Sequence, residues 1–240
     1  NATVYVTLEP CNHQGSTPPC ALLLQSLNVK RVVIGMMDPN PKAAGGKEGL
    51  EEAGIEVICG ITGEACRDLL EPFMMWQKGT FSFFKIAMHQ NGVIDGGIVT
   101  GRDSRMLVHR LRSKTNLLVI GGNTVRVDRP TLDARMCQGK APDVLIYSRQ
   151  KDFDQTIPLF SIANRKVMID DSFKILDDYS FVMIEGGSGM SASLPKETTW
   201  YLLFHSPNFK EGISLNITKN LRLLWQGRCG DDSYGWYKER

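Results

Sequence analysis

The stretch VTLEPCNHQGSTPPC, residues 6–20, joins a strand pattern to the start of a helix and carries two cysteines. Residues 4–8 are rich in β-branched and aromatic side chains, which favour a strand, and Pro10 ends it. The prolines before Cys20 favour the first turn of a helix over ALLLQSL, with Thr17 as its candidate cap. A strand that leads directly into a helix predicts an α/β fold in which Cys11 and Cys20 lie close together.

Three interpretations of this cysteine pair remain open from the residue types. Two buried cysteines that act as small hydrophobic residues are the ordinary case. A disulfide is disfavoured because the other four cysteines have no framework spacing and no export signal is present. Zinc is favoured by the prolines that precede both cysteines and by the helix start at Cys20, which favours the thiolate that binds metals.

Composition places the chain among ordinary globular proteins. It has 240 residues, 42% hydrophobic and 22% charged, with a net charge of +2. This charge gives no argument for nucleic acid or membrane partners, and no apolar run is long enough to span a bilayer. We therefore expect a cytoplasmic protein. The sequence leaves the oligomeric state open, a homo-oligomer included.

The pattern up to residue 79 alternates strands and helices. Residues 31–37 and 55–60 read as buried strands, the segment that ends at Gly54 as a short helix, and residues 62–78 as a longer helix. Such alternation is typical of a parallel sheet covered by helices. We place a domain boundary at Gly79, which divides the chain into residues 1–79 and 80–240.

A second α/β unit is predicted after that boundary. FSFFKIAM (81–88) is a strand pattern, residues 102–114 form an amphipathic helix pattern, and NLLVIGGNTV predicts a strand that runs into a tight turn. Five further strand patterns follow: DVLIYS, RKVMID, FVMIEGG, WYLLFHS and LRLLWQG. The order predicts an open, mostly parallel sheet.

The motif EPCNHQGSTPPC, with DPNP at residues 38–41 and EEAGIEV after it, resembles the bifunctional deaminase and reductase family of riboflavin biosynthesis. This resemblance implies a partial cytidine-deaminase-like domain followed by a dihydrofolate-reductase-like reductase domain. Cys11 and Cys20 match the zinc cysteines of the family. His13 and the segment Asp38, Pro39, Asn40 and Pro41 match positions on the pyrimidine side of its pocket.

The family's third zinc ligand and catalytic Glu come from a His-Ala-Glu motif upstream of this strand. None of the histidines in the 240 residues stands in an HxE setting, and Glu9 precedes the wrong element. The chain as written cannot complete a zinc site of the family type. We expect a fragment of a longer protein rather than a decayed deaminase.

The block VIGGNTVRVDRPTLDAR, residues 119–135, resembles the reductase motif G-x-x-T-V-x-x-D-x-P-x-L-x-x-R. That resemblance implies that Thr124 and Asp128 contact NADPH, and that Leu132 and Arg135 contact the substrate. Arg112 matches the arginine that binds the substrate's ribose phosphate, a task that suits a guanidinium. Arg112 and Arg135 would then form an anion clamp, whereas without the resemblance both are ordinary surface cations.

The block IEGGSGM, residues 184–190, resembles the EGG motif of the reductases. By this match Glu185 would bind substrate, and five residues would border the cofactor: Gly186, Gly187, Ser188, Gly189 and Met190. Met88 falls on the expected nicotinamide side. Lys85, at a strand end, is the candidate for polarising the reacting oxygen, although a surface lysine is nearly as good an interpretation.

The chain departs from the family where the family has K-x-A-x-S-x-D-G. The serine is replaced by His89 and the acid by Asn91, which puts any role of that acid in doubt. The segment that follows is shortened, and Gly96 and Ile98 stand near the places of a family Ser and Trp. Stacking by that Trp cannot be carried over.

The resemblance implies two activities. A zinc-dependent deamination acts on a phosphoribosylated diaminopyrimidine, and NADPH then reduces the ribosyl group of the resulting aminouracil to ribityl. The alternatives are a reductase alone and a nucleotide-binding pseudoenzyme with a vestigial deaminase half.

Overall fold

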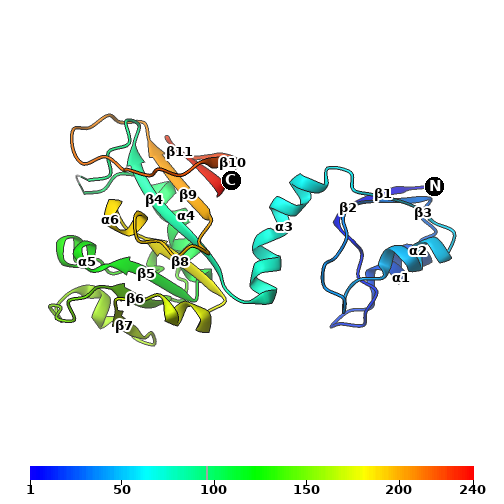
Figure 1. The fold of residues 1–240 in the computed structure, drawn as a ribbon, viewed down its shortest axis with the longest axis horizontal. Coiled ribbons are helices and arrows are strands. Elements are labelled where there is room, and N and C mark those ends of the chain that lie inside the picture. The colour runs from blue at the N-terminus through cyan, green and yellow to red at the C-terminus, as the bar shows by residue number, and fades with distance from the viewer. Residues whose placement is uncertain (96) are drawn as a thin grey trace. The chain divides into compact units, whose positions relative to one another are not determined.

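The computed structural model of the protein describes residues 1–95 and 97–240, which divide into two compact units, residues 1–74 and 75–240 (Figure 1). Gly96, one of the positions compared with the family above, lies outside the described residues. Helix α3 (Gly63–Lys78) begins in the first unit and ends in the second. The boundary predicted at Gly79 follows the last residue of this helix, and the identity of each domain stays a prediction.

The first unit is a three-stranded parallel sheet with two short helices. Strands β1 (Thr3–Leu8), β2 (Arg31–Met36) and β3 (Glu56–Cys59) lie in the order β1-β2-β3. Helices α1 (Cys20–Ser26) and α2 (Gly46–Glu52) connect them, as parallel strands require a crossover. The core of this unit consists of Ala21, Val29, Val32, Ile34, Leu50 and Ile55.

The predicted helix start at Cys20 is confirmed, but the predicted cap is wrong. Pro19 occupies the N-cap position in an extended conformation, and no side chain caps the helix. Two prolines separate Thr17 from Cys20, so the Thr17 hydroxyl is too far along the chain to reach the first free amides. Instead, the Thr17 carbonyl accepts a hydrogen bond from the amide of Gly15.

The second unit is built on one eight-stranded sheet in the order β10-β11-β9-β4-β8-β5-β6-β7. The strands from β9 to β7 in this order are parallel, and β10 and β11 run antiparallel at the other edge. The predicted mostly parallel sheet is therefore confirmed. The strands are β4 (Phe81–His89), β5 (Leu117–Gly121), β6 (Asp143–Tyr147), β7 (Val167–Asp170), β8 (Phe181–Glu185), β9 (Trp200–Ser206), β10 (Leu221–Cys229) and β11 (Asp232–Glu239).

Strand β11 was not predicted because residues 232–239, DSYGWYKE, contain no aliphatic side chain. Their Tyr and Trp side chains favour a strand, but the charged residues and the central glycine weaken that preference. Pairing on both sides, with β9 and β10, makes it a strand. Tertiary context here overrides a weak local preference.

Helix α4 (Arg102–Lys114) matches the predicted bounds, whereas the predicted tight turn after Gly121 is the start of helix α5 (Gly122–Asp128). A β-carbon at Gly122 would lie 2.6 Å from the Ser148 hydroxyl, so only glycine allows this approach. The remaining helical segments are short: α6 (Ser188–Ser191) and the 3₁₀ turns η1 (Arg135–Cys137), η2 (Pro158–Ser161) and η3 (Lys174–Asp178).

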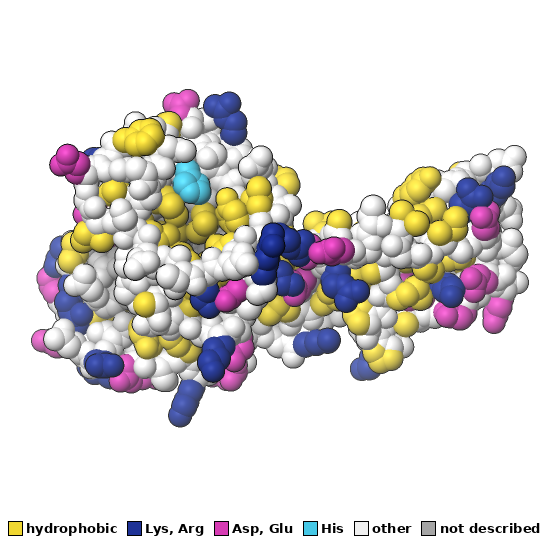
Figure 2. All heavy atoms as spheres, turned by 45° about the horizontal axis from the view of Figure 1, so that its top comes forward, with side chains coloured by type: hydrophobic (Ala, Val, Ile, Leu, Met, Phe, Trp, Pro, Cys, Tyr) yellow, Lys and Arg dark blue, Asp and Glu magenta, His cyan; other side chains and the backbone are white. Residues whose placement is uncertain are grey.

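Two hydrophobic clusters cover the two faces of the large sheet. Alternate residues of β4 point to opposite faces, so Phe83 joins one cluster and Phe84 the other. Val108 of α4 belongs to the cluster of Phe83, and Met190 of α6 belongs to that of Phe84. Figure 2 shows hydrophobic side chains gathered near the middle of one face of this unit, with charged side chains mostly around its rim. Among the described residues, no helix is long and apolar enough to cross a membrane.

Candidate functional site

The centre of the large sheet places Lys85 and Glu185 side by side. Strands β4 and β8 are parallel neighbours, and Lys85 and Glu185 are paired in their register. Glu185 is the last residue of β8, whereas β4 continues to His89. These side chains therefore lie at the carboxyl edge of the parallel strands, where α/β sheets bind ligands.

Arg112 of α4 forms a two-pronged ion pair with Glu185. Its Nε and Nη2 atoms donate to Glu185 Oε1 at 3.2 and 3.1 Å, and Nη2 donates to Oε2 at 2.9 Å. The side chains are only 13% and 10% exposed. The planar guanidinium matches the carboxylate, so one contact holds α4 against β8. The third nitrogen, Nη1, makes no hydrogen bond to the rest of the described chain.

The charges of this cluster shift one another's protonation. Burial lowers the pKa of the Lys85 ammonium, which Glu185 opposes and Arg112 reinforces. Burial alone would raise the pKa of the Glu185 carboxyl, but Arg112 and Lys85 outweigh it, and the pKa is lowered. The Lys85 ammonium also lies 5.8 Å from the centre of the Phe204 ring. Glu185 is thus held ionised, whereas Lys85 is set to release a proton more readily than a surface lysine.

Asp133 supplies a second carboxylate near Arg112. Asp133 accepts a hydrogen bond from Arg135 at 2.7 Å and lies 4.0 Å from Nδ1 of the buried His109. Burial, then Arg112, lower the pKa of His109. With that imidazole neutral, three cations face two carboxylates across Lys85, Glu185, Arg112, Asp133 and Arg135. The site therefore carries an excess of positive charge, which suits an anionic ligand.

The predicted anion clamp is arranged differently from the expectation. Arg112 and Arg135 both lie close enough to lower the pKa of His109, but each already binds a carboxylate of the chain. The side chain of Arg135 is 63% exposed, so its guanidinium is open to solvent and Arg112 is not. An anion would meet Arg135 first and could reach Arg112 only at Nη1.

Leu132 lies in the core and is held in an unusual backbone conformation. It is 4% exposed, packs in the cluster of Phe83, and has φ +55°. Arg165 supports this loop by donating hydrogen bonds to the carbonyls of Thr131, Leu132 and Leu159. The strain of a left-handed leucine costs about 1 kcal/mol and is offset by these bonds. The side chain of Leu132 thus contributes packing, while its backbone sets the position of Asp133.

The predicted cofactor residues fall on three parts of the second unit: helix α5, the glycine block after β8, and strand β4. Thr124 is half-buried in α5, and Asp128 is the exposed last residue of that helix. In the glycine block, a β-carbon at Gly186 would lie 2.6 Å from the Met190 side chain, so this position must stay glycine. Met88 and Met190 are both buried in the cluster of Phe84 and do not line a surface. The exposed backbone of the block is at Gly189, between the half-buried Gly187 and Ser188 and the buried Met190.

Four residues that contact or support the charged cluster were not predicted from the sequence. His109, Asp133, Arg165 and Phe204 stand at positions that the motifs leave variable or do not reach. A lone histidine on an amphipathic helix and an arginine in a loop carry no signal of their own. Their roles follow from three-dimensional contacts with residues distant in the sequence.

In the first unit, the strand end and the helix start bring the two predicted zinc cysteines together. The amide of Cys20 donates to the sulfur of Cys11 at 3.4 Å, and both cysteines are free. A hydrogen bond with Cys11, and then its charge, raise the pKa of the Cys20 thiol. The expected depression by the helix start is therefore not seen for Cys20, because the neighbouring thiol has the larger effect. No group of three metal-ligating side chains occurs among residues 1–95 and 97–240.

Glu9 joins the two motifs of this unit. Its buried carboxylate accepts backbone hydrogen bonds from Asp38 at 3.1 Å, from Gly45 at 3.1 Å and from Lys47 at 3.0 Å. The amide of Asn12 also donates to the carbonyl of Ala43. The DPNP loop is thus held beside the Cys11 loop, and the pocket role of residues 38–41 stays a prediction. The His13 side chain is exposed.

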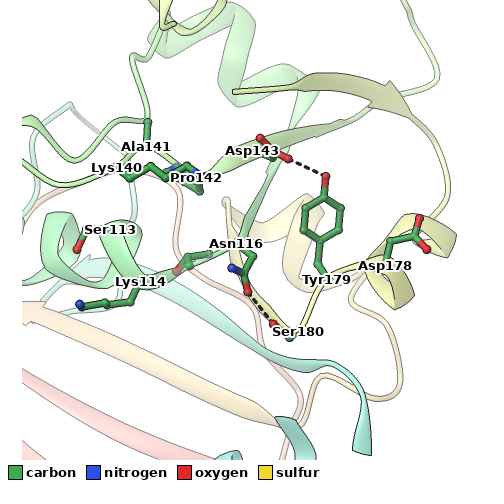
Figure 3. A pocket seen from close by; sticks show the side chains of 11 residues that line it. Ser113, Lys114, Asn116, Lys140, Ala141, Pro142, Asp143, Asp178, Tyr179 and Ser180 are labelled. Atoms are coloured by element: carbon green, nitrogen blue, oxygen red, sulfur yellow. Dashed lines mark hydrogen bonds between the residues drawn. The ribbon is translucent and has the colours of Figure 1, made fainter. Parts of the chain in front are cut away.

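A polar cavity of about 370 Å³ lies at the opposite, amino ends of β5, β6 and β8 (Figure 3). Its walls satisfy one another: Tyr179 donates to Asp143 at 2.9 Å, and Ser180 donates to Asn116 at 2.8 Å. None of the predicted site residues lines it. The cavity is therefore separate from the charged cluster, and it brings together the ends of three strands.

We compared the sequence with family models and with known proteins. No family model matches the chain. Its sequence is 44% identical over 159 residues to the riboflavin biosynthesis protein RibD of Synechocystis, covering 63% of this chain and 43% of that protein. It is 32% identical over 243 residues to RibD of Chlamydia pneumoniae (81% and 64%) and 31% identical over 231 residues to RibD of Haemophilus influenzae (92% and 58%). The chain thus spans less than two thirds of the length of each of these relatives.

Solved structures agree with the sequence matches. A deaminase and 5-amino-6-(5-phosphoribosylamino)uracil reductase of Thermotoga maritima matches 99% of this chain and 79% of its own, with a TM-score of 0.72 and 25% identity. The reductase Rib7 of Saccharomyces cerevisiae matches 72% of this chain and 99% of its own, with a TM-score of 0.56 and 14% identity. The fold therefore includes a unit of the dihydrofolate-reductase-like reductase class, as expected. The sequence is thus similar to RibD proteins along most of this chain.

Loss of the buried charge at Glu185 should destabilise the second unit. In Glu185→Gln the guanidinium of Arg112 and the ammonium of Lys85 lose their counter-ion in a nearly buried place. We expect the free energy of unfolding to fall by about 3 kcal/mol, measured by urea denaturation. Asp154→Asn, which breaks the exposed ion pair with Arg129, is the control and should change little. Equal effects of the two variants would contradict the assigned role of the buried pair.

The Tyr179 contact predicts a pH dependence of stability. Burial, and then the hydrogen bond with Asp143, raise the pKa of Tyr179 from its ordinary value of about 10 to about 12. The folded protein then keeps a phenolic proton that the unfolded chain loses, so stability should fall as the pH rises from 10 to 12. Urea denaturation of the wild type and of Tyr179→Phe tests this, because the variant should show a smaller decline. A decline of equal slope in both would contradict it.

Proposed function

We propose that the chain is part of a riboflavin biosynthesis enzyme and that residues 80–240 are its NADPH-dependent reductase domain. The substrate would be the phosphoribosylaminouracil named for the Thermotoga maritima structure, and the product its ribityl form. The observation that carries the proposal is the half-buried Lys85 beside the ion pair of Glu185 and Arg112, at the carboxyl edge of a reductase fold.

The residues of the charged cluster have complementary tasks in this proposal. Arg135, whose guanidinium is exposed, and the Nη1 of Arg112 would bind the substrate phosphate. Glu185 stays ionised and fixes Arg112, so it orients the phosphate site rather than taking part in proton transfer. The positive excess of the cluster would draw the anionic substrate toward this edge.

Lys85 would supply the proton in the reduction. Its ammonium has a lowered pKa, so it gives up a proton more readily than an ordinary lysine. When the C1–O bond of the ribose ring opens and C1 receives a hydride, the ring oxygen takes up one proton. Lys85 would donate that proton, and the proton would later be replaced from solvent. The net consumption is one NADPH and one proton for each ribityl group formed.

The residues of the second unit also fit a nicotinamide dinucleotide. NADPH, when bound, would supply the hydride. Gly122 allows α5 to approach Ser148 closely, and Gly186 allows the backbone after β8 to pack directly against Met190. Thr124, Asp128 and the block of residues 186–190 would hold the cofactor at the ends of β5 and β8. Ser148, at the end of β6, is a further candidate that the sequence did not suggest.

Steady-state kinetics test the reductase. The chain should oxidise NADPH in the presence of 5-amino-6-(5-phosphoribosylamino)uracil, and Lys85→Met should lower kcat about 100-fold or more, as loss of one positioned donor does. Lys114→Met, a lysine at the other end of the sheet, is the matched control and should keep its activity. Full activity of Lys85→Met would reject the proton donor. NADPH binding without oxidation in the wild type would favour the pseudoenzyme.

For the first unit we propose half of a zinc site for a pyrimidine deaminase. Cys11 and Cys20 offer two sulfur donors close together at a helix start, the donor type that zinc prefers. They would hold the metal, and Glu9 would position the loops around it. Bound zinc would lower the pKa of a water for attack on the pyrimidine. Two of the usual protein ligands come from these residues, so we propose deamination only for the longer protein that the relatives represent.

Metal analysis tests the cysteine pair. We expect protein refolded with zinc and then dialysed to retain the metal, and Cys11→Ser and Cys20→Ser each to lower its zinc content several-fold. Cys59→Ser, which removes another free cysteine, is the control and should leave the content unchanged. Equal zinc in all four proteins would reject the site without affecting the reductase proposal.

A further inference from the structure

A segment of the loop between β9 and β10 lies against the turn that ends β4. Three backbone hydrogen bonds join them: Gln90 donates to Asn208 at 2.8 Å, Ile94 donates to Ile213 at 2.9 Å, and Leu215 donates to Gly92 at 2.9 Å. We call residues 207–215 the wall segment. A β-carbon on Gly212 would collide with the carboxylate of Asp95, so the two chains approach closely.

Asn91 adds a side-chain connection to the middle of the wall segment. Its Nδ2 donates to the carbonyl of Lys210 at 2.6 Å, and its Oδ1 accepts from the amide of Lys210 at 3.3 Å. An amide side chain can donate and accept in this way, whereas a carboxylate can only accept. Asn91 therefore satisfies both backbone groups of Lys210, which the carboxylate of an Asp at this position could not.

The same turn packs against the glycine block. The Ile94 side chain lies 3.4 Å from the place of a β-carbon on Gly187, and Ser188 donates to the carbonyl of Ser214 at 3.4 Å. Ile94 and Leu215 pack against the cluster that contains Met190. The wall segment and the turn after β4 are thus in contact with the residues proposed to border the cofactor.

We infer that the wall segment forms one side of the NADPH site and that Asn91 is the positioning residue that fixes it there. This inference rests on the proposed reductase function. The replacement of the family's acid by Asn91 is then a functional feature of this chain, because it supplies the donor that the wall segment requires.

The test is the variant Asn91→Asp. The carboxylate would face the Lys210 carbonyl without a proton between them, so the wall segment should loosen. We expect faster amide hydrogen exchange in residues 208–215 and a Kd for NADPH that rises about three- to tenfold, the effect of one lost hydrogen bond whose partner stays unpaired. Because Asn91 is exposed, the fold should be retained, which thermal unfolding checks.

Asn164→Asp is the matched control. It makes the same chemical change at an exposed residue before β7, at the far edge of the sheet and outside the wall segment, and its side chain makes no hydrogen bond to the described residues. It should alter neither exchange nor the Kd. The inference is overturned if Asn91→Asp exchanges like the wild type, if exchange rises while the Kd is unchanged, or if both variants weaken NADPH equally. A wild type that binds no NADPH rejects the proposed function itself, and the exchange data then still show whether Asn91 holds the segment.

Discussion

The ion pair between Arg112 and Glu185 is the interaction on which the candidate site depends. A carboxylate that is 8% exposed at the end of a central strand would be strongly destabilising without a partner. Two cations meet it, one from the neighbouring strand and one from the helix that covers the same face of the sheet. The pair therefore fixes the position of α4 over the sheet, next to Lys85, whose pKa is lowered by burial, with Glu185 opposing and Arg112 reinforcing the shift. Lys85, Arg112 and Glu185 therefore matter both for stability and for the proposed chemistry, and a substitution of any one of them affects the other two.

Further residues gather around this pair. Arg112 uses two of its nitrogens for Glu185, so the accessible cation of the cluster is Arg135 rather than Arg112. Asp133 orients Arg135, and Asp133 is positioned by a loop with a left-handed Leu132. Arg165 stabilises that loop through three carbonyls. The support thus runs from hydrogen bonds of Arg165, through the backbone of Leu132 and Asp133, to the ion pair with the exposed guanidinium of Arg135.

The sequence predicts the helices and strands that carry the site better than the contacts between its side chains. The bounds of α4, the strand that carries Lys85 and the strand that ends at Glu185 follow from apolar periodicity, because these segments are buried on a defined face. Arg112, Arg135 and Glu185 all appear in motifs, but the pairing of Arg112 with Glu185 does not, and Asp133, the partner of Arg135, stands at a variable motif position. Nothing local indicates that Arg112 binds Glu185, since 73 residues separate them. Strand β11 and helix α5 were missed or misassigned because pairing and glycine packing outweigh their weak local patterns.

Departures from a family pattern are informative when the structure supplies the contact that the new residue makes. From the sequence alone, Asn91 in place of an acid suggests a lost function. In the structure its amide bonds the backbone of Lys210 in both directions. Glu9 gives the complementary case: it stands outside the expected catalytic motif, yet three backbone amides converge on its carboxylate. In both positions the choice between acid and amide is set by whether the surrounding backbone offers donors alone or a donor and an acceptor together.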